Sequence, residues 1–175
     1  MKEWILNSSY LKEKIPLISA GNRILLSGTV YTARDAAHKR IVALLENGDA
    51  LPFSLNGAAI YYAGPTPTPS NMVIGSCGPT TSSRMDVFTP VLLDAGLACM
   101  IGKGNRSAEV VNSIVNNKAI YLCAIGGAGA LAAKHITACE EIAFKELGCE
   151  SVKKLEFKDF PLVCAIDCCG NSLFI

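Results

Sequence analysis

The sequence predicts a single α/β domain with a mixed sheet and flanking helices. Its 175 residues match the length of one domain, and no internal repeat or long linker divides them. Between residues 72 and 134, apolar runs alternate with segments of helical spacing, which favours a parallel layer of strands joined by helices. Strand-like runs before and after this region predict a mixed, partly β-rich arrangement. Within the domain 1–175, residues 1–20 are expected to form an N-terminal extension.

The elements before residue 64 follow from turn residues and apolar spacing. Residues 23–31 come after a Gly-Asn turn and carry the apolar, partly β-branched run of a strand. Residues 33–47 place apolar side chains at helical spacing, and Gly48 is a suitable helix stop. Residues 58–63 predict a second, short strand.

The elements after residue 63 alternate more regularly. Prolines keep residues 64–71 extended, because each proline disfavours the α region for the residue before it. Ser107 is a suitable N-cap for a helix over 107–117, whose apolar residues lie on one face. The remaining predictions are strands at 72–76, 97–101, 119–125, 152–157 and 162–167, a helix from about 84 to 95, and a small-residue helix ending near 134.

The composition excludes several classes of protein. Half of the residues are hydrophobic, 18% are charged and the formal net charge is +1, which excludes a disordered chain and binding of nucleic acid by positive charge. Prolines and glycines interrupt the uncharged stretch 50–83, so it cannot form a membrane-spanning helix. Charged and polar residues occupy the N-terminus, where a signal peptide needs an apolar core. We expect a cytoplasmic protein that contacts no membrane and buries apolar surface against a partner.

The eight cysteines predict no metal site in this chain. No two of them form a C-x-x-C pair, which is the usual local signature of zinc sites, redox centres and iron–sulfur clusters. Free cysteines mostly behave as small buried hydrophobic residues. Cys77 is of interest because it adjoins the loop with the most distinctive chemistry.

Three cations lie in three loops that follow predicted strands: Arg34, Arg84 and Lys103. Ligands of open α/β sheets bind outside the carboxyl ends of the strands. Two guanidinium groups and an ammonium group from such loops would suit a small dianion such as a dicarboxylate. The alternative is a solvated arginine at an ordinary helix cap and a glycine-rich surface turn around Lys103.

The loop around Arg84 is the most informative of the three. A Gly-Pro pair precedes four hydroxyl residues, Thr80 to Ser83, at the expected start of a helix. A hydroxyl can cap that helix, and the free N–H groups of its first turn favour an anion. The sequence contains neither a Walker A loop nor a G-x-G-x-x-G fingerprint. His38 and His135 are interpreted as structural residues.

These motifs resemble the β region of class I, iron–sulfur-dependent fumarate hydratases. The resemblance rests on residues 28–40, 78–85 and 102–105 and continues to the C-terminus. The β subunits of L-tartrate dehydratases share much of the pattern, but residues 104–107 are more similar to the fumarase branch.

The resemblance implies a swivelling β/β/α domain of a hydro-lyase that interconverts fumarate and L-malate. It implies that Arg34, Arg84 and Lys103 bind the dicarboxylate, that Arg84 and Lys103 also act in catalysis, and that Thr80 and Thr81 lie at the reacting carbon. Thr80 would take part in proton transfer together with an acid from another chain, because a threonine hydroxyl is a poor base by itself.

The resemblance also implies a [4Fe–4S] cluster that is held by a fumarase α subunit and not by this chain. The chain is too short to include the α region, so we expect it to be inactive alone and to form a hetero-oligomer or a homodimer of the β chain. Two alternatives remain open. The chain could belong to an L-tartrate dehydratase or another hydroxy-diacid dehydratase, or it could be a non-catalytic subunit that binds a dicarboxylate or directs assembly.

Overall fold

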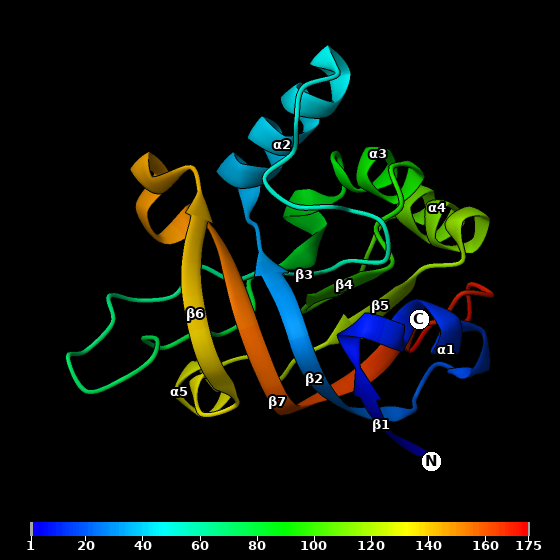
Figure 1. The fold of residues 1–175 in the computed structure, drawn as a ribbon. Helices are drawn as coiled ribbons and strands as arrows, with labels where there is room; N and C mark the ends of the chain where they lie inside the picture. The colour runs from blue at the N-terminus through cyan, green and yellow to red at the C-terminus, as the bar shows by residue number, and fades with distance from the viewer. Residues whose placement is uncertain (1, 175) are drawn as a thin grey trace.

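Residues 2–174, which the computed structural model describes, form one mixed sheet of seven strands flanked by helices (Figure 1). The strand order is β1-β2-β3-β4-β5-β7-β6, which confirms the predicted mixed α/β architecture. The strands are β1 Glu3–Asn7, β2 Arg23–Thr32, β3 Ala59–Tyr61, β4 Cys99–Gly102, β5 Ile120–Cys123, β6 Ile136–Ala143 and β7 Val152–Ile166. The α-helices are α1 Leu11–Lys14, α2 Asp35–Asn47, α3 Thr89–Asp94, α4 Ala108–Asn117 and α5 Gly129–Ala133. Short 3-10 segments are Ser8–Tyr10, Ile15–Leu17, Ser82–Met85 and Lys145–Glu150.

The sheet closes into a ring, because β7 pairs with two strands that lie far apart in the strand order. Strands β1 to β5 are joined by parallel pairs, whereas β7 runs antiparallel to β2, β5 and β6. The pairs β2–β3–β4–β5–β7–β2 therefore make a closed path, with β1 and β6 outside it. With 15 residues, β7 is long enough to pair with all three partners.

Two apolar clusters lie on the two faces of the sheet. Along β3, Tyr61 packs in one cluster and Ile60 in the other, because successive side chains of a strand point to opposite faces. Tyr61, Phe157 and Phe160 form an aromatic group in the first cluster, and the ring centroids of the stacked pair Phe157 and Phe160 are 4.2 Å apart. The second cluster packs the sheet against α2, α3 and α4, which lie together on one side in Figure 1.

Helices α2 and α4 form as the sequence predicts. Helix α2 buries Ala37 and Ile41, and Gly48 ends it in the left-handed conformation, at a φ of 71°, that glycine adopts without strain. Ser107 caps α4, since its hydroxyl accepts a hydrogen bond from the Val110 N–H at 3.3 Å. The turn residues of the sequence therefore set the ends of both helices.

The predicted strand at 72–76 and the predicted helix at 84–95 are wrong. Residues 72–76 lie in an irregular loop, which folds back so that the Thr66 N–H donates to the Ser76 carbonyl at 3.0 Å. Residues 84–95 contain the end of a 3-10 turn and the separate six-residue helix α3. Pro90 stands in the first turn of α3, where a proline fits, but it cannot donate the hydrogen bond that one continuous helix would require.

The strands of the C-terminal half also differ from the sequence-based predictions. Strand β6 was not predicted, because its largely exposed residues show no clear alternation of polar and apolar side chains. The two strands predicted at 152–157 and 162–167 form the single strand β7, in which Asp159 takes a left-handed φ of 48°. At the other end of the chain, residues 2–20 contribute β1 and α1. Within the described residues, no helix is long and apolar enough to cross a membrane.

Candidate functional site

The carboxyl ends of β2, β3 and β4 lie at one edge of the sheet, because these strands are parallel neighbours. Arg34 comes two residues after β2, and Lys103 comes directly after β4. Parallel pairing therefore brings two of the predicted site residues to the same edge.

The loop that carries Thr80, Thr81 and Arg84 reaches this edge although no strand precedes it. After β3 the chain makes a long excursion over residues 64–78 and then returns. The Thr80 N–H donates to the Tyr62 carbonyl at 2.7 Å, just beyond the end of β3. Thr81 then bridges in parallel to Lys103, beyond the end of β4. The structure thus places Thr80 and Thr81 between the ends of these two strands.

Arg34 and Arg84 meet at one carboxylate. The Nε of Arg84 lies 2.9 Å from Oδ1 of Asp35, and a terminal nitrogen of Arg34 lies 3.7 Å from Oδ2 of Asp35. The same nitrogen of Arg34 is 3.3 Å from Oε1 of Glu150. The side chain of Arg84 is 51% exposed and that of Arg34 only 19%. Arg34, Arg84 and Lys103, the residues predicted to bind a dicarboxylate, are called the clamp. Its two arginines are therefore neighbours, and Arg84 offers the more accessible guanidinium.

A buried hydrogen-bond chain fixes the backbone of Lys103. Its N–H donates to the Ser82 Oγ at 3.0 Å, and its carbonyl accepts from the Ser82 N–H at 2.9 Å. The Tyr121 hydroxyl lies 2.8 Å from both the Ser82 Oγ and the Gly104 carbonyl. Because a carbonyl can only accept, Tyr121 donates to Gly104 and Ser82 donates to Tyr121. The backbone on both sides of the Lys103 side chain is thus held by buried groups.

Two glycines permit this close packing. A Cβ at position 102 would collide with the Ser82 hydroxyl and lie 2.9 Å from a ring carbon of Tyr62. A Cβ at Gly126 would lie 3.4 Å from the Lys103 side chain. The glycine-rich loop after β5, which we interpret from the sequence as a packing feature, therefore contacts the predicted site lysine.

Arg106 lies beside the candidate site, and no motif in the sequence singles it out. Its side chain is fully buried, and its Nε lies 2.7 Å from Oδ1 of Asp86. It also donates to the Thr89 hydroxyl at 2.7 Å, and its guanidinium lies over the Tyr62 and Tyr121 rings. Asp86 in turn accepts from the Ser107 N–H at 2.7 Å. This ion pair ties the loop of Lys103 to the loop of Arg84, which no local motif signals.

His38 and Cys77, which adjoin the site loops in the sequence, are both buried. Burial lowers the pKa of His38 to about 4, so its ring is neutral at pH 7. With Nδ1 it contacts the Arg34 carbonyl at 2.9 Å, and its ring packs against Tyr62 and Phe88. Burial raises the pKa of the Cys77 thiol to about 12, and thiols that stay protonated are poor nucleophiles and ligands.

The expected anion site at a helix N-terminus does not form. Thr81 precedes a 3-10 turn and not an α-helix, and its side chain makes no capping hydrogen bond. Among residues 2–174, no group of three or more His, Cys, Asp or Glu side chains is placed to hold a metal ion. The edge gathers cationic and hydroxyl side chains together with the carboxylates of Asp35 and Glu150.

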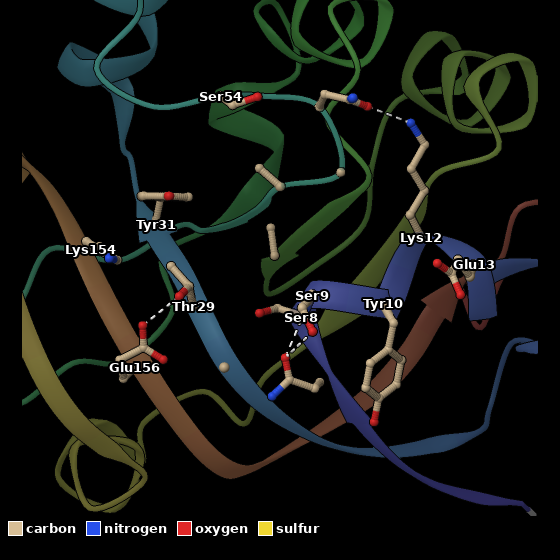
Figure 2. Close-up of a pocket in the computed structure, with 16 residues that line it drawn as sticks. Ser8, Ser9, Tyr10, Lys12, Glu13, Thr29, Tyr31, Ser54, Lys154 and Glu156 are labelled. Carbon is tan, nitrogen blue, oxygen red and sulfur yellow. Dashed lines mark hydrogen bonds between the residues drawn. The ribbon is translucent and has the colours of Figure 1, made fainter.

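A large cavity among the described residues lies elsewhere. Its volume is about 890 Å³ (Figure 2). It lies beside the middle of β2, between the part of β2 that pairs with β1 and the part that pairs with β3. Figure 2 shows Thr29 and Glu156 joined by a hydrogen bond on one wall and Lys12 on another. Lys12 donates to the Asn56 side-chain oxygen at 2.8 Å. None of the five predicted site residues lines it.

The fold and the edge residues define an α/β domain with a candidate site for a small anion. The chain belongs to the Fumarase C-terminus family, whose model matches residues 1–175.

Three relatives illustrate the two kinds of protein that this chain resembles. Fumarate hydratase 2 of Leishmania major is 38% identical over 166 residues, which cover 94% of this chain and 29% of the relative. The aerobic class I fumarate hydratase of Escherichia coli K12 is 40% identical over 154 residues, covering 87% of this chain and 28% of the relative. A putative L(+)-tartrate dehydratase subunit beta of Methanocaldococcus jannaschii is 37% identical over 169 residues, covering 93% and 87%. The chain thus spans less than a third of these fumarate hydratases but most of the dehydratase subunit.

Proposed function

We propose that this chain is the β subunit of a two-subunit hydro-lyase that reversibly hydrates fumarate to L-malate. The observation that carries the proposal is the edge of β2, β3 and β4, where Asp35 joins Arg34 to Arg84 and where Lys103 is held beside Thr81. Two guanidinium groups and one ammonium group match the two carboxylates of such a substrate. Family membership supports the class of chemistry.

In this proposal the chain binds and orients the substrate. Arg84, the more exposed arginine, takes one carboxylate in a bidentate contact, Arg34 contributes a second guanidinium, and Lys103 supplies positive charge that no carboxylate in residues 2–174 compensates. Thr80 and Thr81 lie next to the reacting carbon. A threonine hydroxyl is too weak a base to act alone at neutral pH, so the proton transfer at Thr80 requires an acid or base from the partner.

We place the [4Fe–4S] cluster on an α partner, where its open iron would act as a Lewis acid. The residues of this chain do not fit the cluster, since its buried thiols favour the protonated form and no ligand set gathers in residues 2–174. The same proposal includes a swivelling motion of this domain that closes the edge over the partner's site.

A β subunit of an L-tartrate dehydratase is the second candidate, because two relatives at 37% and 34% identity carry that name. The chain covers 87% of the dehydratase subunit of Methanocaldococcus jannaschii and 85% of the L(+)-tartrate dehydratase subunit beta of Escherichia coli K12. Both candidate substrates carry two carboxylates, so the clamp would serve either. The two candidate substrates differ in the substituents on the carbons between those carboxylates.

Anaerobic co-expression with the cluster-bearing protein that co-purifies with the chain tests the proposal. We expect no hydration of fumarate by the chain alone and turnover by the complex. Arg84→Ala or Lys103→Ala should lower kcat/KM by two orders of magnitude or more, whereas Arg23→Ala, a matched change at an exposed arginine on β2, should leave it unchanged. Full activity of the chain alone would refute the division of the site between two chains.

A substrate panel and calorimetry separate the candidates. Preferential dehydration of L-tartrate by the same complex would select the dehydratase. Binding of fumarate without turnover of any hydroxy-diacid would identify a non-catalytic dicarboxylate-binding subunit.

A further inference from the structure

Four side chains at the candidate site form a line of alternating charge. Glu150 contacts Arg34 at 3.3 Å, Arg34 contacts Asp35 at 3.7 Å, and Asp35 contacts Arg84 at 2.9 Å. The side chains of Asp35 and Glu150 are only 32% and 22% exposed. Ion pairs that are partly withdrawn from water are screened less than exposed pairs and hold their partners in fixed geometry.

Glu150 holds Arg34 and the start of α2 at the same time. Arg34 is the N-cap residue of α2, and its side chain makes no capping hydrogen bond. The vacant capping role passes to Glu150, whose Oε2 accepts from the Ala36 N–H at 3.0 Å while its Oε1 faces Arg34. One carboxylate from a segment 114 residues further along the chain thus fixes both the helix end and the guanidinium.

The absence of a side chain at Gly64 leaves room for Arg34. A Cβ at Gly64 would come within 3.0 Å of an Arg34 terminal nitrogen and 3.1 Å of the Cys149 carbonyl. The guanidinium therefore lies against the bare backbone of Gly64, next to the residues that lead to Glu150.

Asp35 turns Arg84 so that its outer edge is available. The Asp35 contact uses Nε of Arg84. In residues 2–174, no carboxylate other than that of Asp35 pairs with Arg84 within 4.0 Å. The two terminal nitrogens are the pair of donors with which an arginine grips a carboxylate end-on.

We propose that Asp35 and Glu150 are positioning residues of the dicarboxylate clamp: Glu150 fixes Arg34, and Asp35 orients Arg84. The proposal rests on the proposed function. It differs from the simpler idea that Asp35 occupies Arg84 only until a substrate displaces it, because the two ideas predict opposite changes in substrate affinity when Asp35 loses its charge.

Steady-state kinetics of the assembled complex test the proposal. Glu150→Gln and Asp35→Asn keep the shape of each side chain and remove its charge. Each should raise KM for fumarate about tenfold, the loss of one charge-assisted contact, and leave kcat within about twofold, because the arginines bind substrate and transition state alike. Glu150→Asp, which keeps the charge, should restore part of the affinity.

Glu146→Gln is the matched control. Glu146 lies on the same 3-10 segment and pairs with Arg40 of α2 at 3.0 Å, but it does not contact Arg34. A control variant with the same rise in KM would show a general loosening of α2 and refute the proposal. A fall in KM for Asp35→Asn would show that Asp35 only competes with substrate and would likewise overturn it.

Arginine side-chain NMR on the chain separates this proposal from the proposed function. The Nε–H group of Arg34 should be as rigid as the backbone in the wild type and mobile in Glu150→Gln. If the complex turns over neither fumarate nor L-tartrate while this change in mobility is seen, the proposed function fails and the positioning role stands. If Arg34 is equally mobile in both forms, the positioning role fails whatever the activity.

Discussion

Removal of the Asp86 carboxylate should destabilise the domain more than most surface substitutions. Asp86 is the carboxylate paired with Arg106, whose side chain is fully buried, and it also accepts the Ser107 N–H. Asp86→Ala leaves the buried guanidinium without a counter-charge and the start of α4 without one acceptor. The remaining side-chain contacts of Arg106 are to neutral groups: the Thr89 hydroxyl, the Met100 sulfur and two aromatic rings.

The expected loss is about 3–5 kcal/mol of unfolding free energy, the usual consequence of breaking a buried ion pair by removing one partner. Against a total of about 5–15 kcal/mol, this would leave a weakly stable domain. For a chain of this size, each kcal/mol lowers Tm by about 2–4 °C, so Tm should fall by about 10 °C.

Urea unfolding followed by circular dichroism measures this loss, with Asp94→Ala as a control at an exposed carboxylate of α3. The double variant Asp86→Ala, Arg106→Met should be more stable than Asp86→Ala alone, because removal of both charges also removes the unpaired one. A loss below about 1 kcal/mol for Asp86→Ala would refute the argument, since exposed ion pairs are worth no more than that.

Three further predictions concern the pH dependence of stability, the packing and the charge of the site. The neutral His38 has a folded pKa of about 4, set mainly by burial, against about 6.5 when unfolded. As the pH falls from 6.5 to 4, protonation of His38 in the unfolded chain should lower the unfolding free energy by up to about 3 kcal/mol. Urea unfolding at each pH measures this, and the difference in unfolding free energy between wild type and His38→Gln should change over the same pH range. Gly102→Ala should lower the unfolding free energy by about 2 kcal/mol and raise KM, because the new Cβ would meet Ser82 and Tyr62. The control Gly104→Ala places its Cβ in open space and should show only backbone strain. Equal losses of unfolding free energy in the two variants would contradict the packing argument. Lys103→Gln should remove most of the dependence of KM for fumarate on ionic strength, and an unchanged salt dependence would exclude Lys103 as the main source of attraction.

Local signals in the sequence predicted the elements that local chemistry determines. Gly48 and Ser107 mark the ends of α2 and α4 as expected. Parallel β4 and β5 follow from short apolar runs between helices, whereas β3 takes the place beside β4 that the sequence predicts for residues 72–76. The edge position of Arg34 and Lys103 follows in turn, because residues after parallel strands share an edge.

Contacts between distant segments were beyond the reach of the sequence. Residues 72–76 have the composition of a strand, but no neighbouring strand edge pairs with them. The closure of the ring depends on β7 meeting β2 after more than a hundred intervening residues. Glu150 lies in an unremarkable charged segment, and only the fold brings its carboxylate to Arg34.

Charge compensation divides the three cations of the site into two kinds. Arg34 and Arg84 lie against Asp35 and Glu150, so this line of four groups carries no net charge and can hold its geometry in the absence of substrate. Within residues 2–174, no carboxylate lies within 4.0 Å of the Lys103 ammonium group. The arginines should therefore determine the orientation of a bound dicarboxylate, while Lys103 supplies the uncompensated positive charge that attracts it. Under the proposed function, this division accounts for the binding of a dianion by a chain with a formal net charge of +1: the attraction would arise from Lys103, whose backbone is held in place, and not from an excess of basic residues.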